Sequence, residues 1–242
     1  MKNKVVCLDE KKVFPSALER FIQTCGFDLD RKKHQRMMQM AYDVRKNGLD
    51  GIDIKAVVSY YGSEVFKDGR IEAEGQKIQC NYFSQMPEGV VEGVYFYVLT
   101  VGECLFPSEE QIMDFLYADI WGTSYVDAGI AELKQSFLEK DLKDRFPERE
   151  LYLSEEFGPG YFGMPVIESK KFMKLLDADL IDVWVKESGL MIPQKTCTGL
   201  YLVLNRNDVK ADVACMQCRG NSAGCMFCAI RGKMEKAEEK IK

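Results

Sequence analysis

Four cysteines near the C-terminus carry the clearest chemical pattern in this sequence. Cys215, Cys218, Cys225 and Cys228 form two Cys-x2-Cys pairs that are separated by six residues. Such pairs can present four thiolates in a tetrahedron, which is the ligand set of a zinc ion or an iron–sulfur cluster. The gap between the pairs is shorter than in zinc ribbons. The spacing predicts a metal site, leaves zinc and iron–sulfur equally open, and keeps unliganded cysteines as a third alternative.

The composition is that of a globular chain of 242 residues, 46% hydrophobic and 29% charged, with a formal net charge of -5. Lys and Arg are not clustered, which argues against a nucleic-acid partner. The apolar run of residues 94–101 is far shorter than a membrane span, and the N-terminus lacks the apolar core of a signal peptide. We therefore expect a cytoplasmic protein with no nucleic-acid or membrane partner, whose five scattered cysteines are small buried hydrophobes.

Hydrophobic periodicity predicts the elements that position these groups. Apolar residues three and four apart indicate helices, the first of which ends at Gly26, and Ser108 with Gln111 forms a capping box at the start of a later helix. Residues 52–83 read as irregular structure with short strands. We expect helices over residues 16–25, 37–47, from 108 to a break at Gly122, 126–137 and up to about 176, and strands over residues 94–101, from 151, 181–185 and 196–204.

The order of these elements predicts the fold class. Strands and helices do not alternate strictly, which favours an α+β fold with a mostly antiparallel twisted sheet and flanking helices. A small Cys-rich segment follows it. We place the first domain at residues 1–210, and the Cys-rich segment with its charged tail at residues 211–242.

Asp119 is a carboxylate in an apolar helical stripe. It follows Ile112, Phe115 and Leu116 at helical spacing, so it shares their face of the helix. One interpretation is an exposed aspartate at the edge of the stripe. The other is a buried acid aimed at a backbone or ligand donor, because an unpaired buried carboxylate is costly. The sequence leaves both open.

The loop at residues 158–163 reads Gly-Pro-Gly-Tyr-Phe-Gly and formally matches the dinucleotide pattern G-x-G-x-x-G between a strand and a helix. Pro159 has no N–H to donate to a phosphate, and two aromatic residues crowd the loop. A structural turn is therefore favoured over a Rossmann nucleotide site.

Two stretches resemble the activation domain of cobalamin-dependent methionine synthase. Residues 156–204 share Pro159-Gly160-Tyr161, a helix ending in Leu-Leu-Asp, and the step Thr-Cys-Thr-Gly into a strand; residues 116–131 resemble the family's helix with its aspartate, here Asp119. The resemblance implies binding of S-adenosylmethionine and docking on a cobalamin domain, so that cob(II)alamin can be reduced and remethylated.

The ligand groove of that family carries an Arg-x-x-x-Gly-Tyr signature. Gly160 and Tyr161 match its Gly-Tyr, whereas Glu156 stands at the arginine position. A glutamate would repel the ligand's carboxylate, unless a nearby cation such as Lys195 compensates. The resemblance implies a ligand site built from Asp119, Glu156, Gly158, Pro159, Gly160 and Tyr161, and we add Lys195 to it as the compensating cation.

These observations lead to two hypotheses. The favoured one is a free-standing relative that docks on a corrinoid protein or methyltransferase, supports its reductive reactivation and presents S-adenosylmethionine as methyl donor. The partner would carry the cobalamin, an electron donor would be required, and an iron–sulfur cluster is favoured because zinc has no redox chemistry. The alternative is a non-catalytic interaction or assembly module with a structural zinc. Whether the chain is itself an enzyme of a methionine synthase system is left open.

Overall fold

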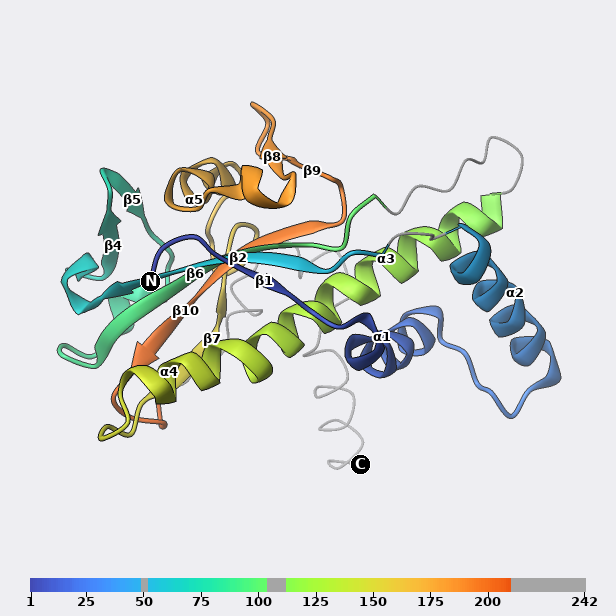
Figure 1. Cartoon of the computed structure of the whole chain (residues 1–242), viewed down its shortest axis with the longest axis horizontal. Coiled ribbons are helices and arrows are strands. Elements are labelled where there is room, and N and C mark those ends of the chain that lie inside the picture. The colour runs from blue at the N-terminus through green and yellow to red at the C-terminus, as the bar shows by residue number, and fades with distance from the viewer. Residues whose placement is uncertain (49–51, 104–111, 210–242) are drawn as a thin grey trace, which may run out of the picture.

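A five-stranded antiparallel sheet forms the centre of the computed structural model, which describes residues 1–48, 52–103 and 112–209 (Figure 1). Its strand order is β1-β2-β6-β10-β7, and every neighbouring pair is antiparallel. The five strands are β1 (Lys4–Cys7), β2 (Lys55–Gly62), β6 (Val91–Thr100), β7 (Tyr152–Phe157) and β10 (Thr196–Leu204). This arrangement confirms the predicted α+β fold.

Four helices, α1 to α4, lie on one face of this sheet, and α5 with two small sheets lies on the other (Figure 1). The helices are α1 (Glu10–Cys25), α2 (Lys32–Gly48), α3 (Ile112–Leu133), α4 (Glu139–Arg145) and α5 (Ser169–Leu175). The small sheets consist of β3 (Phe66–Lys67), β4 (Arg70–Ala73) and β5 (Gln76–Ile78), and of β8 (Trp184–Val185) and β9 (Met191–Ile192). Within the described residues, no helix is long and apolar enough to cross a membrane.

Strand β6 shows how the two cores are divided. Successive side chains of a strand point to opposite faces, so Tyr95, Tyr97 and Leu99 enter the core beneath α1 and α3, whereas Phe96 and Val98 enter the core beneath α5. Between α1 and α3, the rings of Phe21 and Trp121 stack with centroids 4.0 Å apart. The sheet is therefore buried on both sides.

Several predicted elements were correct. The first helix ends where expected, at Cys25, and Gly26 caps it in the left-handed conformation at φ 63°. It begins earlier than predicted, at Glu10, because Asp9 caps its first turn and the helix continues through Pro15. The second helix ends at Gly48, and β10 has the predicted bounds.

Other predictions were wrong. Residues 55–62 form the full strand β2, whose two buried faces hide any alternation. Residues 112–133 form one continuous helix, so the expected break at Gly122 does not occur. The strand expected at 181–185 is only Trp184–Val185, after a 3-10 turn. Cys7, expected to be buried, is exposed. The capping box at Ser108 lies outside the described residues.

Candidate functional site

The predicted metal ligands Cys215, Cys218, Cys225 and Cys228 lie outside the described residues. Within the described ranges, no three His, Cys, Asp or Glu side chains gather as metal ligands would. The metal site stays a prediction from the sequence.

Lys195 and Asp119 meet between the start of β10 and helix α3. The Lys195 ammonium lies 2.6 Å from Asp119 Oδ1 and donates to Thr123 Oγ1 at 2.9 Å. The Lys195 side chain is 13% exposed and that of Asp119 is 46% exposed. Asp119 is therefore a half-exposed acid that forms an ion pair with a lysine. This outcome lies between the two interpretations that the sequence left open. The assignment of Asp119 and Lys195 to a ligand site stays a prediction.

Glu156 points toward helix α3 and away from α5. It lies on β7 opposite Tyr201, and it accepts a short hydrogen bond from the Tyr97 hydroxyl. Burial raises the pKa of Glu156, the Tyr97 hydrogen bond opposes that rise, and the nearby Asp127 adds to it. Burial next to Glu156 also raises the pKa of the Cys197 thiol to about 12. The carboxylate at the arginine position is thus already engaged by the protein.

A lysine directly after α3 adjoins Glu156 and its neighbours. Lys134 lies in a π-helical turn that continues α3, donates to the Ser154 carbonyl at 3.1 Å and lies 5.0 Å from the centre of the Tyr201 ring. Ser154 in turn accepts from the Leu202 amide, where the register of β7 and β10 shifts. π-helical turns and β-bulges are both frequent near functional sites. Neither irregularity has a recognisable signal in the sequence.

The loop between β7 and α5 uses its own amides. Gly160 N–H donates to the Met164 carbonyl at 2.8 Å, and Tyr161 N–H donates to the Gly158 carbonyl at 3.0 Å. Gly160 and Gly163 adopt positive φ angles of 95° and 79°. Because these amides are paired within the loop, they do not face a phosphate as the amides of a dinucleotide loop do. This supports the structural turn.

Gly158 holds this loop against the sheet. A Cβ atom at this position would lie 2.9 Å from the backbone oxygen of Thr198 on β10. Pro159 follows at the turn, and the Tyr161 side chain is 56% exposed. The loop therefore approaches β10 at a distance that only glycine permits.

A pocket of about 620 Å³ lies beside the same loop. Gly163 and Pro165 of the loop form one wall, and residues of the β3–β5 sheet and of α5 form the others. Its lining is mostly polar and contains Lys77, Asn81 and Lys171. This pocket adjoins the predicted ligand loop, but none of the predicted ligand residues lines it.

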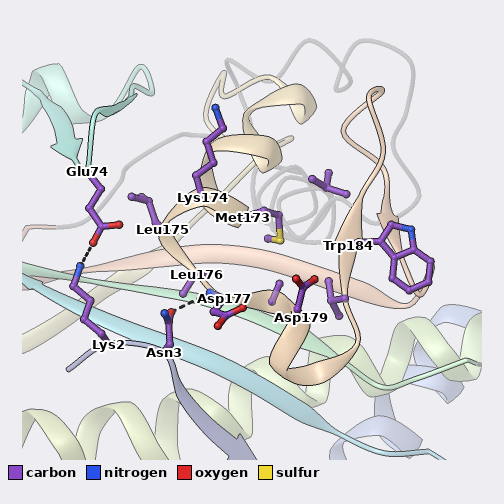
Figure 2. Close-up of a pocket in the computed structure, with 13 residues that line it drawn as sticks. Lys2, Asn3, Glu74, Met173, Lys174, Leu175, Leu176, Asp177, Asp179 and Trp184 are labelled. Carbon is purple, nitrogen blue, oxygen red and sulfur yellow. Dashed lines mark hydrogen bonds and ion pairs between the residues drawn. The ribbon is translucent and has the colours of Figure 1, made fainter.

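A second pocket, of about 390 Å³, lies at the β1 edge of the sheet (Figure 2). Lys2 pairs with Glu74 on one side, and Asn3 accepts a hydrogen bond from the Asp177 amide at 3.0 Å (Figure 2). Trp184 borders the pocket and is 54% exposed. These contacts tie the N-terminal segment to Glu74 on one side and to Asp177 on the other.

The structure thus brings together only part of the predicted ligand set. Asp119 contacts Lys195, whereas Glu156 contacts Tyr97, and the loop residues Gly158, Pro159, Gly160 and Tyr161 are held by the loop and by β10. Sequence reasoning missed Tyr97. The only sequence signal for Tyr97 is the alternation of side chains along the strand predicted at residues 94–101. This alternation decides toward which face of the sheet each side chain points.

The chain matches no protein-family model and no curated protein sequence. Among solved structures, it is similar to one described as the MetH reactivation domain bound to AdoHcy. The TM-score is 0.58 and the identity 12%, with 86% of this chain and 80% of that chain covered. The likeness extends over most of both chains and shows that they share a fold.

Proposed function

We propose that this chain supports the reductive reactivation of a corrinoid protein, most simply the cobalamin-binding part of a methionine synthase system. The observation that carries the proposal is the fold, which matches a MetH reactivation domain over 86% of this chain. That protein is described as bound to AdoHcy, the product left when S-adenosylmethionine gives up its methyl group. We therefore propose S-adenosylmethionine as the methyl donor of this chain.

The proposed division of labour follows the two segments of the chain. Residues 1–210 would dock on the corrinoid protein and bind the methyl donor near Asp119, Glu156, the loop 158–161 and Lys195. Residues 211–242 would hold an iron–sulfur cluster through Cys215, Cys218, Cys225 and Cys228, since four thiolates suit such a cluster. A cluster of this kind can pass on the single electron that reduction of cob(II)alamin requires.

A second candidate function is a non-catalytic module that binds the corrinoid protein and holds a structural zinc. The observation that favours it concerns Glu156. This residue stands where the family's arginine would meet a ligand carboxylate, and its own carboxylate accepts a hydrogen bond from the Tyr97 hydroxyl. In this alternative the fold serves docking and has lost methyl-donor binding. The redox state of the chain would then have no effect on the partner.

One assay separates the two candidates. The chain is purified anaerobically, reduced, and mixed with a corrinoid partner in the cob(II)alamin state and with S-adenosylmethionine. We expect the absorption spectrum of methylcobalamin to appear only when the chain is present. The control is the same chain with Cys215→Ala and Cys218→Ala, which should stop the reaction, compared with Cys7→Ala, which removes an exposed thiol and should not. Equal rates with and without the chain would refute the proposed function.

A further inference from the structure

The central sheet has two edge strands, and they differ in how well they are protected against pairing with a further strand. At the β7 edge, the Lys134 ammonium donates to the Ser154 carbonyl at 3.1 Å, and the register against β10 shifts between Tyr201 and Val203. A charged side chain and a bulge are two devices that keep an edge strand from pairing with another chain. The β1 edge has no bulge and no proline, and within the described residues β2 is its single neighbour in the sheet. The β1 edge is therefore the more open of the two.

The hydrogen bonds of β1 leave two of its residues facing outward. The Leu8 N–H donates to the Ile54 carbonyl at 2.9 Å, directly after the ladder that pairs Cys7 with Lys55. In an antiparallel ladder, hydrogen-bonded pairs alternate with pairs whose N–H and C=O groups point away from the partner strand. Val5 and Cys7 are of the second kind. Both residues are also exposed, Val5 by 36%, so their backbone groups are available to one more strand.

The charges on either side of these two residues have opposite signs. Lys4 precedes Val5, Asp9 follows Cys7, and both charged residues are exposed. An antiparallel partner with the same sequence would lay its acidic end along Lys4 and its basic end along Asp9. A parallel partner of that kind would bring like charges together, which is destabilising. The β1 edge is thus electrostatically complementary to a second, reversed copy of itself.

We propose that two copies of this chain associate through β1 in an antiparallel contact with two-fold symmetry. Such a contact is self-complementary, because the same two residues meet twice, once from each copy. With Val6 on the two-fold axis, Val5 of each copy forms a hydrogen-bonded pair with Cys7 of the other, which satisfies the outward N–H and C=O groups of both residues. The two five-stranded sheets then continue into one another.

The size of this contact sets its expected strength. Strand β1 has four residues, whereas a standard stable interface buries roughly 800 Å² and about 20 to 30 residues on each side. The dimer is therefore a weak one, with a dissociation constant between about 1 and 100 µM. The proposal does not depend on the corrinoid partner, because it uses no residue of the proposed ligand site.

Sedimentation equilibrium of the full chain over about 1 to 300 µM, under reducing conditions, measures this dissociation constant. Val5→Pro removes the outward N–H without removing a hydrogen bond to β2, and proline is tolerated at such positions of edge strands. We expect it to weaken the dimer at least about tenfold, because the symmetry removes two hydrogen bonds at once. The matched control is Val5→Ala, which keeps the N–H and should stay within about threefold of the unaltered chain. The thermal midpoint of each variant is recorded to confirm folding.

Cross-linking tests the register of the contact. In the proposed pairing the Cys7 residues of the two copies are diagonal neighbours, and such neighbours in an antiparallel pair lie about 7 to 8 Å apart. A short bismaleimide should therefore join two copies through their exposed Cys7 thiols. The covalent dimer should disappear in Cys7→Ser and persist in Cys25→Ser, which alters a less exposed thiol at the end of α1.

Three results would overturn the proposal. The first is a chain that stays monomeric over the whole concentration range. The second is a dimer that Val5→Pro and Val5→Ala weaken equally, since the outward N–H of residue 5 would then not take part. The third is a covalent dimer that persists in Cys7→Ser, which would place the contact between copies away from β1.

Discussion

The Lys195 side chain packs across Gly122, in a space that exists because Gly122 has no side chain. A Cβ atom at Gly122 would lie 2.8 to 2.9 Å from three carbons of the Lys195 side chain. This close approach lets the Lys195 ammonium reach Asp119 and Thr123, which lie one turn apart on α3. The start of β10 is thereby fixed to the long helix through a residue, Gly122, that the sequence presents as a helix breaker.

The first prediction concerns this contact. Gly122→Ala should lower the free energy of unfolding by about 1 kcal/mol, because displacing Lys195 loses two charged hydrogen bonds while alanine recovers up to roughly 1 kcal/mol of helix propensity. In a Lys195→Ala background the clash is gone, so Gly122→Ala should instead be stabilising. Urea unfolding of the four proteins measures this change of sign.

Gly129→Ala serves as the control for that cycle. A Cβ atom there would be 3.2 Å from Ile54 and 3.4 Å from Leu99, and it does not touch Lys195. Its effect should be the same in both backgrounds. If Gly122→Ala is also equally destabilising in both, Lys195 does not occupy the space over Gly122.

The continuity of α3 shows what sequence periodicity could not predict. Gly122 lowers helix propensity locally, and this favoured a break. The packing of Gly122 against Lys195 and of Gly129 against Ile54 outweighs that preference, yet both partners are far away in the sequence. The alternating strand β10 and the Gly26 cap were predictable, because their signals are local. The strand β2 was not, because its two faces are both buried.

The second prediction concerns Glu156 and pH. Burial raises the pKa of this carboxyl in the folded protein above about 4.3, its usual value in an unfolded chain. The contribution of the protonated Glu156 carboxyl to the free energy of unfolding is therefore fully present below that value. It is lost as the pH rises through the pKa of the folded protein. Glu156→Gln keeps an acceptor for Tyr97 without the charge, so it should be more stable than the unaltered chain at pH 7.

The advantage of Glu156→Gln should shrink as the pH falls toward about 4, where Glu156 is protonated in the unaltered chain as well. Urea unfolding at several pH values measures it. The control is Glu148→Gln, which removes a charge from an exposed turn after α4 and should show no such trend. A Glu156→Gln variant that is less stable at every pH would mean that the ionised carboxylate is required by its neighbours.

The environment of Glu156 marks the limit of the sequence reasoning about the site. A motif places a residue at a position in the chain, but only the strand register decides which neighbours it meets. The pairing of Glu156 with Tyr201, and of Gly199 with Tyr97, brings the Tyr97 hydroxyl to the carboxylate. These pairings join three strands across more than a hundred residues. The contact of Lys195 with Asp119 likewise joins the start of β10 to α3 across more than seventy residues.

The third prediction concerns the cysteines at 215, 218, 225 and 228. We expect anaerobically purified protein to contain iron and acid-labile sulfide and to absorb visible light, since four thiolates can hold such a cluster. Cys218→Ala should lose the iron and the colour, whereas Cys7→Ala should keep both, because Cys7 is a separate exposed thiol on β1. A colourless protein with stoichiometric zinc would exclude the redox role.

The last prediction concerns the loop at residues 158–161, which belongs to the proposed ligand site. Gly160 has a φ of 95°, and the nearest atom to an added Cβ would be Val166 Cγ2 at 3.9 Å, so a side chain fits but its backbone conformation is strained. Gly160→Val should lower stability by about 1 to 2 kcal/mol and deform the loop. Gly26→Val imposes comparable strain at φ 63°, also in open space, but at the end of α1. We expect both variants to lose stability and only Gly160→Val to lose affinity for S-adenosylhomocysteine in calorimetry. Equal affinities in the two variants would mean that the loop geometry does not shape the ligand site.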